Sequence, residues 1–183
     1  HQCEETWIRN GRRVNPGRRH IKPEGMIFPQ SLDLCLISPS SVVIRRDLLE
    51  RTGLFDEALP ACEDYDLWLR ITLREKVGML GKALVIKHGG HEDQLSRQFP
   101  AMDRFRVYSI CRLLDTAGGA MPEEYREMAR RAAVQKCRVL LKGARRRGKC
   151  ALADALERII CSLEDEGGRP SGYGILADTA SHP

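Results

Sequence analysis

Short runs of apolar and β-branched residues, separated by polar and glycine-containing segments, mark the first half of the chain. Residues 6–9 and 12–14 flank the pair Asn10-Gly11, which supplies the positive φ angles of a type I′ turn, so a β-hairpin is expected there. The run 41–44 is β-branched and predicts a strand, and the apolar run 84–86 predicts a short buried strand.

Two helices are expected between these strands. Residues 46–52 provide two helical turns, and Gly53 follows them as a C-terminal cap, because glycine adopts positive φ angles without steric cost. Residues 64–74 place three large apolar side chains on one helical face. These are Leu67, Trp68 and Ile71. We therefore expect Trp68 in the core and not at a surface where a sugar ring would stack.

The apolar spacing becomes consistently helical after Pro100. Residues 102–111 predict one helix, and Pro122 occupies the first-turn position that proline favours at the start of a second. A third helix over 152–163 would pair with the second in antiparallel fashion across a short turn. From Gly167 on, Gly, Pro and Ser dominate, and we expect disorder.

The predicted fold class is therefore α/β, a partial mixed sheet with helices, followed by a C-terminal α-helical appendage. The expected division is a first unit over residues 1–98, helices over 99–165 and a disordered tail over 166–183. In the first unit we expect at least one strand edge without a partner.

Composition narrows the classes of function. The 183 residues are 42% hydrophobic and 30% charged with a net charge of +5, a soluble profile, and no apolar run approaches a membrane span. Seven cysteines without C-x-x-C spacing indicate reduced, mostly buried thiols. We expect a cytoplasmic location, with a peripheral contact at the inner face of the membrane left open. Aromatic residues make up 5% and do not interleave with basic clusters, which argues against nucleic-acid binding.

Five basic residues and two glycines lie within the segment 142–149, which ends the helix that starts at Pro122. One interpretation is a solvated helix end, where cations are favoured by the helix dipole. The alternative is contact with a phosphate or a membrane surface.

The densest chemical signal lies at the start of the helix predicted over 64–74. Three carboxylates fall within four residues, namely Glu63, Asp64 and Asp66. Acids are common at exposed helix N-termini because the dipole favours them, and this alone would account for the cluster. The other interpretation is a carboxylate positioned as a general base.

Together with its neighbours, this segment resembles family 2 glycosyltransferases of the GT-A fold, over roughly residues 1–115. The resemblance is carried by Gly-Leu-Phe-Asp-Glu at 53–57 and by Glu-Asp-Tyr-Asp-Leu-Trp-Leu-Arg at 63–70. The strand-like stretch 37–46 resembles the one that leads into the first motif, and 87–96 is similar to a segment of one bacterial branch.

The resemblance implies transfer of a sugar from a nucleoside diphosphate donor to a carbohydrate or lipid-linked hydroxyl acceptor, with inversion. It places the general base on Asp64 and gives Glu63 an orienting role, whereas Asp66 is expected to be structural. His88 and His91 flank two glycines and are the expected cofactor-binding residues. His91 is the candidate ligand of a divalent metal, Mn²⁺ or Mg²⁺, and the alternative is a histidine that hydrogen-bonds locally.

One departure from the family pattern limits this interpretation. These enzymes carry a nucleotide-binding half on the N-terminal side that ends in an Asp-x-Asp motif, and no such motif lies near the start of this sequence. The chain is therefore expected to be the acceptor-side portion of such an enzyme, without its nucleotide-binding half and with its activity alone in question. The alternative is a non-catalytic protein-interaction module or a relic.

Overall fold

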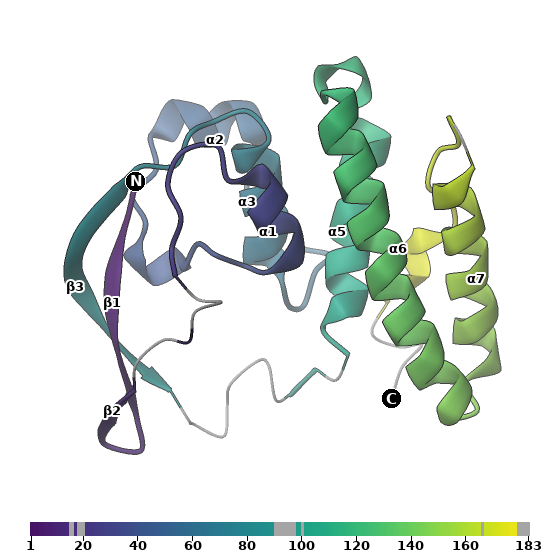
Figure 1. Ribbon diagram of the computed structural model, residues 1–183, viewed down its shortest axis with the longest axis horizontal. Coiled ribbons are helices and arrows are strands. Elements are labelled where there is room, and N and C mark those ends of the chain that lie inside the picture. The colour runs from purple at the N-terminus through teal and green to yellow at the C-terminus, as the bar shows by residue number, and fades with distance from the viewer. Residues whose placement is uncertain (15–16, 18–20, 90–97, 100, 166, 179–183) are drawn as a thin grey trace.

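The computed structural model describes residues 1–14, 17, 21–89, 98–99, 101–165 and 167–178. These residues form a mixed α/β fold with a three-stranded sheet at one end, short helices in the middle and three longer helices at the other end (Figure 1). The strands are β1 (Gln2–Arg9), β2 (Arg12–Val14) and β3 (Met79–Gly89). The predicted fold class, α/β followed by helices, is confirmed.

The sheet has the order β2-β1-β3 and mixes both directions of pairing. β1 and β2 are antiparallel, with Trp7 opposite Val14, and the turn between them uses positive φ angles of 49° at Asn10 and 73° at Gly11. The predicted hairpin is confirmed. β1 runs parallel to β3, from Gln2 opposite Met79 to Arg9 opposite Gly89, with register shifts near Glu4.

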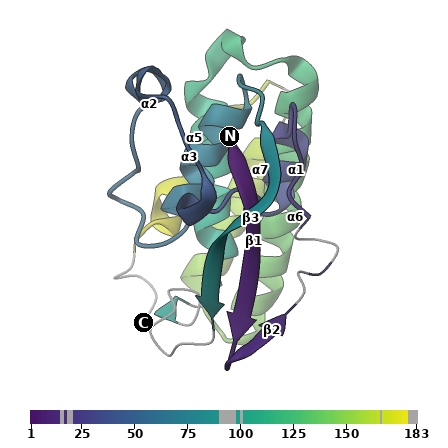
Figure 2. The same ribbon diagram turned by 90° about the vertical axis from the view of Figure 1, so that its left-hand side faces the viewer.

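Two strand predictions need correction. Residues 84–86 do lie in a strand, but they are not buried: Leu84 is 65% exposed and Ile86 is 61% exposed. The described helices cover only one face of the sheet, and Figure 2 shows β1 and β3 in front of them. In the described part of the chain, β3 pairs with β1 alone, so its other edge has no partner there.

The expected strand at 41–44 is wrong. A 3₁₀ turn, η2 (Pro39–Ser41), precedes a single bridge from Val42 to Gln2, and Val43 is 78% exposed. Among the described residues, the backbone of Val43 bonds with that of His1, just before β1, and the chain enters a helix at Arg46. The run is β-branched, but among the described residues a single bridge to Gln2 is all that pairs it with a strand, so no ladder forms.

The helices of the first half are α1 (Phe28–Asp33), α2 (Arg46–Thr52) and α3 (Glu63–Thr72). α2 ends at Gly53 with φ of 86°, as the sequence predicts, because residues with a Cβ rarely adopt positive φ angles. α3 buries Trp68 at 3% exposure beside Leu67 and Ile71, which confirms a core position for the indole.

The second half consists of α5 (Asp103–Thr116), α6 (Glu123–Arg146) and α7 (Cys150–Glu164), with a short 3₁₀ turn, η3 (Gly118–Ala120), before α6. α6 and α7 run side by side in opposite directions, joined by a short turn, as predicted (Figure 1). Within the described residues, no helix combines the length and the apolar character needed to cross a membrane.

The segment after Gly167 differs from the expected disorder. Residues Tyr173–Leu176 form a 3₁₀ turn, η4, and Leu176 is completely buried. The ring of Tyr173 lies 5.7 Å from that of Tyr108 on α5, measured between centroids. The Gly-, Pro- and Ser-rich composition concealed these few apolar side chains, whose burial against α5 outweighs the local preference for disorder.

Candidate functional site

The acidic cluster lies at the first turn of α3. Cys62, the residue before the helix, adopts the left-handed conformation with φ of 64°, which is uncommon for a residue other than glycine. This turn of the backbone brings Glu63 and Asp64 into the first turn of α3, and both side chains are half-buried. Backbone strain of this kind is often concentrated at functional sites.

Two hydrogen bonds fix the carboxylate of Asp64. Its Oδ1 accepts the backbone N–H of Tyr65 at 2.7 Å, and its Oδ2 accepts the thiol of Cys35 at 3.4 Å. Burial raises the pKa of the Cys35 thiol, and the charge of Asp64 raises it further, so the thiol keeps its proton. The hydroxyl of Tyr65 donates to the carbonyl of Leu32 at 2.7 Å and ties α3 to α1.

Asp66 occupies a different environment from Asp64. It is 2% exposed, and its Oδ2 accepts a hydrogen bond from Nε of Arg70 at 2.9 Å. Arg112 of α5 lies 3.9 Å from the same oxygen. A buried carboxylate paired in this way serves the packing of α3, in agreement with the structural role expected for it.

Arg70 also holds the loop 53–57 against α3. Its guanidinium donates to the carbonyl oxygen of Thr52 at 2.6 Å and to that of Leu54 at 2.7 Å. At the other end of this loop, Asp56 is ion-paired with Arg112. The two motifs that carry the family resemblance are thus one unit, which was not predicted because the partners lie far apart along the chain.

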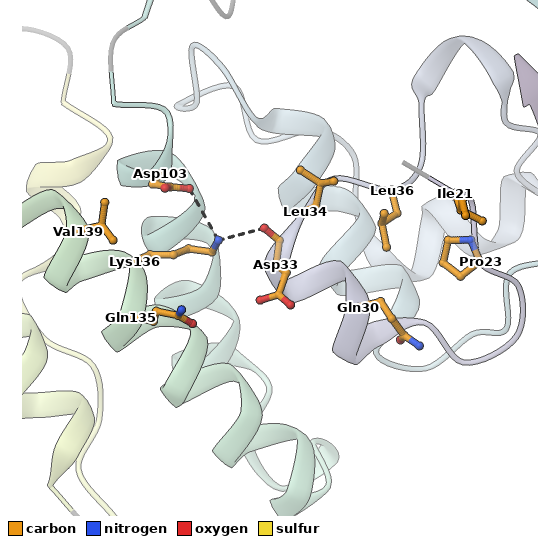
Figure 3. A pocket seen from close by; sticks show the side chains of 10 residues that line it. All are labelled: Ile21, Pro23, Gln30, Asp33, Leu34, Leu36, Asp103, Gln135, Lys136 and Val139. Carbon is orange, nitrogen blue, oxygen red and sulfur yellow. Dashed lines mark hydrogen bonds and ion pairs between the residues drawn. The ribbon is translucent and has the colours of Figure 1, made fainter. Parts of the chain in front are cut away.

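A cavity of about 610 Å³ lies next to the residues that contact Asp64 (Figure 3). Leu34 and Leu36, which flank Cys35, line it, and Asp64 itself does not. Lys136 of α6 also lines the cavity, and its Nζ donates to the carbonyl oxygen of Asp33 at 3.1 Å. The same ammonium group lies 3.7 Å from the carboxylate of Asp103.

Of the two histidines expected to bind a cofactor, the structure describes His88 but not His91. His91 lies outside the described residues, so its expected role as a metal ligand stays a prediction. His88 is exposed near the end of β3, opposite Ile8, and is not among the described contacts of Asp64. Among the described residues, no group of three His, Cys, Asp or Glu side chains is arranged to hold a metal ion.

The sequence did not predict a buried polar cluster around Glu5 of β1. Glu5 of β1 is ion-paired with Lys22 at 3.3 Å, and Lys22 donates to Ser41 Oγ at 2.6 Å. Trp7 Nε1 donates to the same carboxylate at 2.9 Å. Burial raises the pKa of Glu5, but hydrogen bonds from Ser41 and Ser38 and the charge of Lys22 outweigh it, so the net shift is downward.

Comparisons with known proteins find distant relatives over part of the chain. No family model matches the chain, and no solved structure matches it. The chain is 32% identical over 87 residues to an uncharacterized glycosyltransferase of Rickettsia felis, which covers 44% of this chain and 14% of that protein. Similar proteins of the same description from Rickettsia bellii and Rickettsia conorii are each 30% identical, over 45% and 44% of this chain. The matched part spans only 13% to 14% of these relatives, and the chain is thus distantly similar to proteins named as glycosyltransferases.

Proposed function

We propose that the chain is the acceptor-side portion of a family 2, GT-A-type glycosyltransferase that moves a sugar from a nucleoside diphosphate donor to a hydroxyl acceptor. The observation that carries this proposal is Asp64, a half-buried carboxylate held by two hydrogen bonds at the start of α3. One of these bonds comes from Cys35, whose chain neighbours Leu34 and Leu36 line a cavity. The similarity to proteins named as glycosyltransferases supports the class of reaction.

The proposed step is an inverting displacement. The acceptor hydroxyl gives its proton to Asp64 while its oxygen bonds to the anomeric carbon of the donor sugar, and the bond from that carbon to the diphosphate breaks. A hydroxyl is a weak nucleophile until its proton can leave, which is why one carboxylate must lie beside it. The nucleoside diphosphate leaves with the electron pair, and a divalent ion, with His91 as a ligand, would neutralise its charge.

Glu63 has an orienting role in this proposal. It precedes Asp64 in the same helical turn and is also half-buried, so its carboxylate would accept hydrogen bonds from sugar hydroxyls. The acceptor, a carbohydrate or a lipid-linked sugar, would enter from the cavity lined by Asp33 and Asp103.

A second candidate is a non-catalytic protein-interaction module. It is favoured by the apolar side chains of Leu84 and Ile86, which are exposed on the outer side of the sheet. Exposed apolar patches of this kind often mark contact surfaces.

Release of nucleoside diphosphate distinguishes the two candidates. The complete gene product would be incubated with a panel of nucleoside diphosphate sugars and candidate acceptors in the presence of Mn²⁺ or Mg²⁺. The transferase predicts acceptor-dependent release with at least one donor and a product of inverted anomeric configuration, read by NMR. Absence of release across the panel would favour the interaction module.

A further inference from the structure

A second cavity, of about 580 Å³, lies where the start of α5, the end of α6 and the start of α7 meet. Four cationic side chains line it: Arg104, Arg106, Arg147 and Lys149. Asp103 is the one acidic residue that lines it within the described part of the chain. The cavity includes one end of the basic segment 142–149, and it shares Asp103 and Val139 with the cavity of about 610 Å³ described above.

Arg104 is the most unusual of these cations. Its side chain is 5% exposed, and its Nε and Nη1 are buried without a hydrogen-bond partner among the described residues. The guanidinium lies 4.4 Å from the ring centroid of Phe105, and the charge of Asp178 also acts on it. Buried guanidinium donors are costly when they have no acceptor, so these atoms are suited to an anionic ligand.

Two further guanidinium groups contribute to the cavity. Arg106 donates from Nη1 to Asp103 at 2.8 Å, and its Nε is buried without a partner among the described residues. Arg147 folds back over α6 at Gly143, where an added Cβ would lie only 2.9 Å from its Nη2. Glycine at this helical position therefore leaves room for the guanidinium at the cavity wall.

The rest of the lining is apolar. Met102, Val139, Leu140 and Leu152 contribute to it. Planar guanidinium forks match the geometry of phosphate oxygens, and three arginines line this cavity. We propose that this cavity binds a phosphate or diphosphate ester, with the anion on Arg104 and Arg147 and the organic part against Leu140 and Leu152.

Two sources supply this chemistry, a nucleotide and a lipid phosphate, and calorimetric titration of the 183-residue chain distinguishes them. The probes are inorganic diphosphate, uridine diphosphate, farnesyl diphosphate and farnesol. The proposal predicts that inorganic diphosphate binds and that one of the two organic diphosphates binds at least about tenfold more tightly. The tighter of the two identifies the source. Binding of farnesol as tight as that of farnesyl diphosphate, or no binding of any diphosphate, would overturn the proposal.

Paired variants separate a built site from general attraction to a basic surface. Arg147→Ala with Lys149→Ala removes two lining charges, and Arg145→Ala with Arg146→Ala removes two neighbouring charges that do not line the cavity. At 0.15 M salt, we expect roughly tenfold weaker diphosphate binding or more in the first pair and less than about twofold in the second, because distant surface charges are screened. Equal losses in both pairs would contradict a defined site.

Gly143→Ala gives a test that preserves every charge. Alanine stabilises a helix interior more than glycine does, so the variant should fold at least as well as the parent chain. Its Cβ would displace the guanidinium of Arg147, so diphosphate binding should weaken severalfold. Unchanged affinity would show that the position of the Arg147 guanidinium over Gly143 has no part in binding. None of these titrations depends on sugar transfer, so failure here leaves the proposed function untouched, and the reverse is equally true.

Discussion

The cysteines of this protein differ in how strongly burial suppresses the reactivity of their thiols. Burial raises the pKa of Cys62 to about 11 and that of Cys137 to about 12. Cys150 and Cys161, in contrast, are exposed on α7. A thiol reacts as its thiolate, so both exposure and pKa decide which cysteines are reactive.

Two of the seven thiols should therefore react quickly with Ellman's reagent at pH 8 in the folded protein. These are Cys150 and Cys161, and the other five should react only after denaturation. The double variant Cys150→Ser with Cys161→Ser serves as the control and should lose the fast phase. Rapid labelling of four or more thiols in the folded parent would contradict the burial described here.

Glu5 makes folding stability depend on pH. Its pKa in the folded protein lies below the usual value of 4.5. A lowered pKa contributes stability that is present above the unfolded value and is lost as the pH falls through the folded value. Glu5→Gln should therefore lower the free energy of unfolding by about 2 kcal/mol at pH 7, the scale of a hydrogen bond to a charged group.

The measurement for Glu5 is urea unfolding at pH 7 and pH 3. The deficit of Glu5→Gln should shrink at pH 3, where the parent carboxyl is becoming protonated as well. Glu4→Gln, at the neighbouring position of β1, is the matched control and should change stability by less than about 0.5 kcal/mol at both values. An equal deficit of Glu5→Gln at both pH values would argue that the ion pair with Lys22 has no part in it.

At the scale of elements, α3 and the loop before it behave as one unit through Arg70. Arg70→Ala removes the partner of buried Asp66 and both contacts to the loop carbonyls. Breaking one side of a buried ion pair costs about 3 kcal/mol or more. We expect a loss of this size in urea unfolding, whereas Arg74→Ala, one turn further and exposed, should stay within about 0.5 kcal/mol. Similar losses in both variants would show that Arg70 has no special role.

How far the sequence predicts these elements depends on whether the cause is local. The hairpin at Asn10-Gly11 and the end of α2 at Gly53 follow from backbone preferences of one or two residues, and both were predicted. The failed strand at 41–44 and the exposure of Leu84 depend on which other segments lie alongside them. Periodicity identifies an apolar face, but it does not say whether anything covers that face.

The residues of the candidate site also divide into those with a local signal in the sequence and those that depend on contacts between distant positions. Asp64 and Glu63 were singled out from the sequence because helix-start acids and a motif lie within a few consecutive residues. Cys35 and Arg112 were missed, since their contacts with α3 and its loop join positions far apart in the chain. The left-handed conformation of Cys62 carries no signal of its own in a cysteine side chain.

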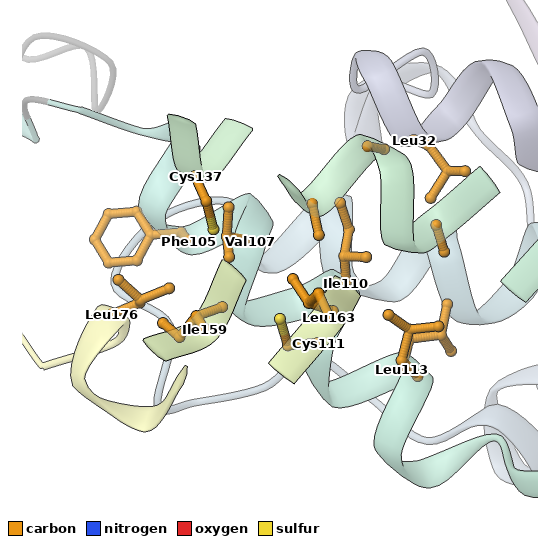
Figure 4. Packing of buried hydrophobic residues seen from close by; sticks show 14 of the residues in the cluster. Leu32, Phe105, Val107, Ile110, Cys111, Leu113, Cys137, Ile159, Leu163 and Leu176 are labelled. Atoms are coloured by element: carbon orange, nitrogen blue, oxygen red, sulfur yellow. The ribbon is translucent and has the colours of Figure 1, made fainter. Parts of the chain in front are cut away.

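The larger of two apolar clusters among the described residues crosses the expected boundary at residue 98. Leu32 of α1 packs in the same cluster as Ile110 of α5, Cys137 of α6 and Ile159 of α7 (Figure 4). The C-terminal helices are therefore not packed as a separate core. They form one wall of the cavity beside Asp64, through Lys136 of α6, and so contribute directly to the proposed acceptor side.

The most direct test of the account is Asp64→Asn in the complete gene product, with turnover and donor binding both measured. The substitution keeps the shape of the side chain and removes its capacity to accept a proton. We expect turnover to fall by about 100-fold or more, the scale of losing a general base, while the dissociation constant of the donor changes little. Asp47→Asn, an exposed acid on α2, should leave both quantities unchanged. An Asp64→Asn enzyme with near-normal turnover would contradict the assignment of the base and the mechanism built on it.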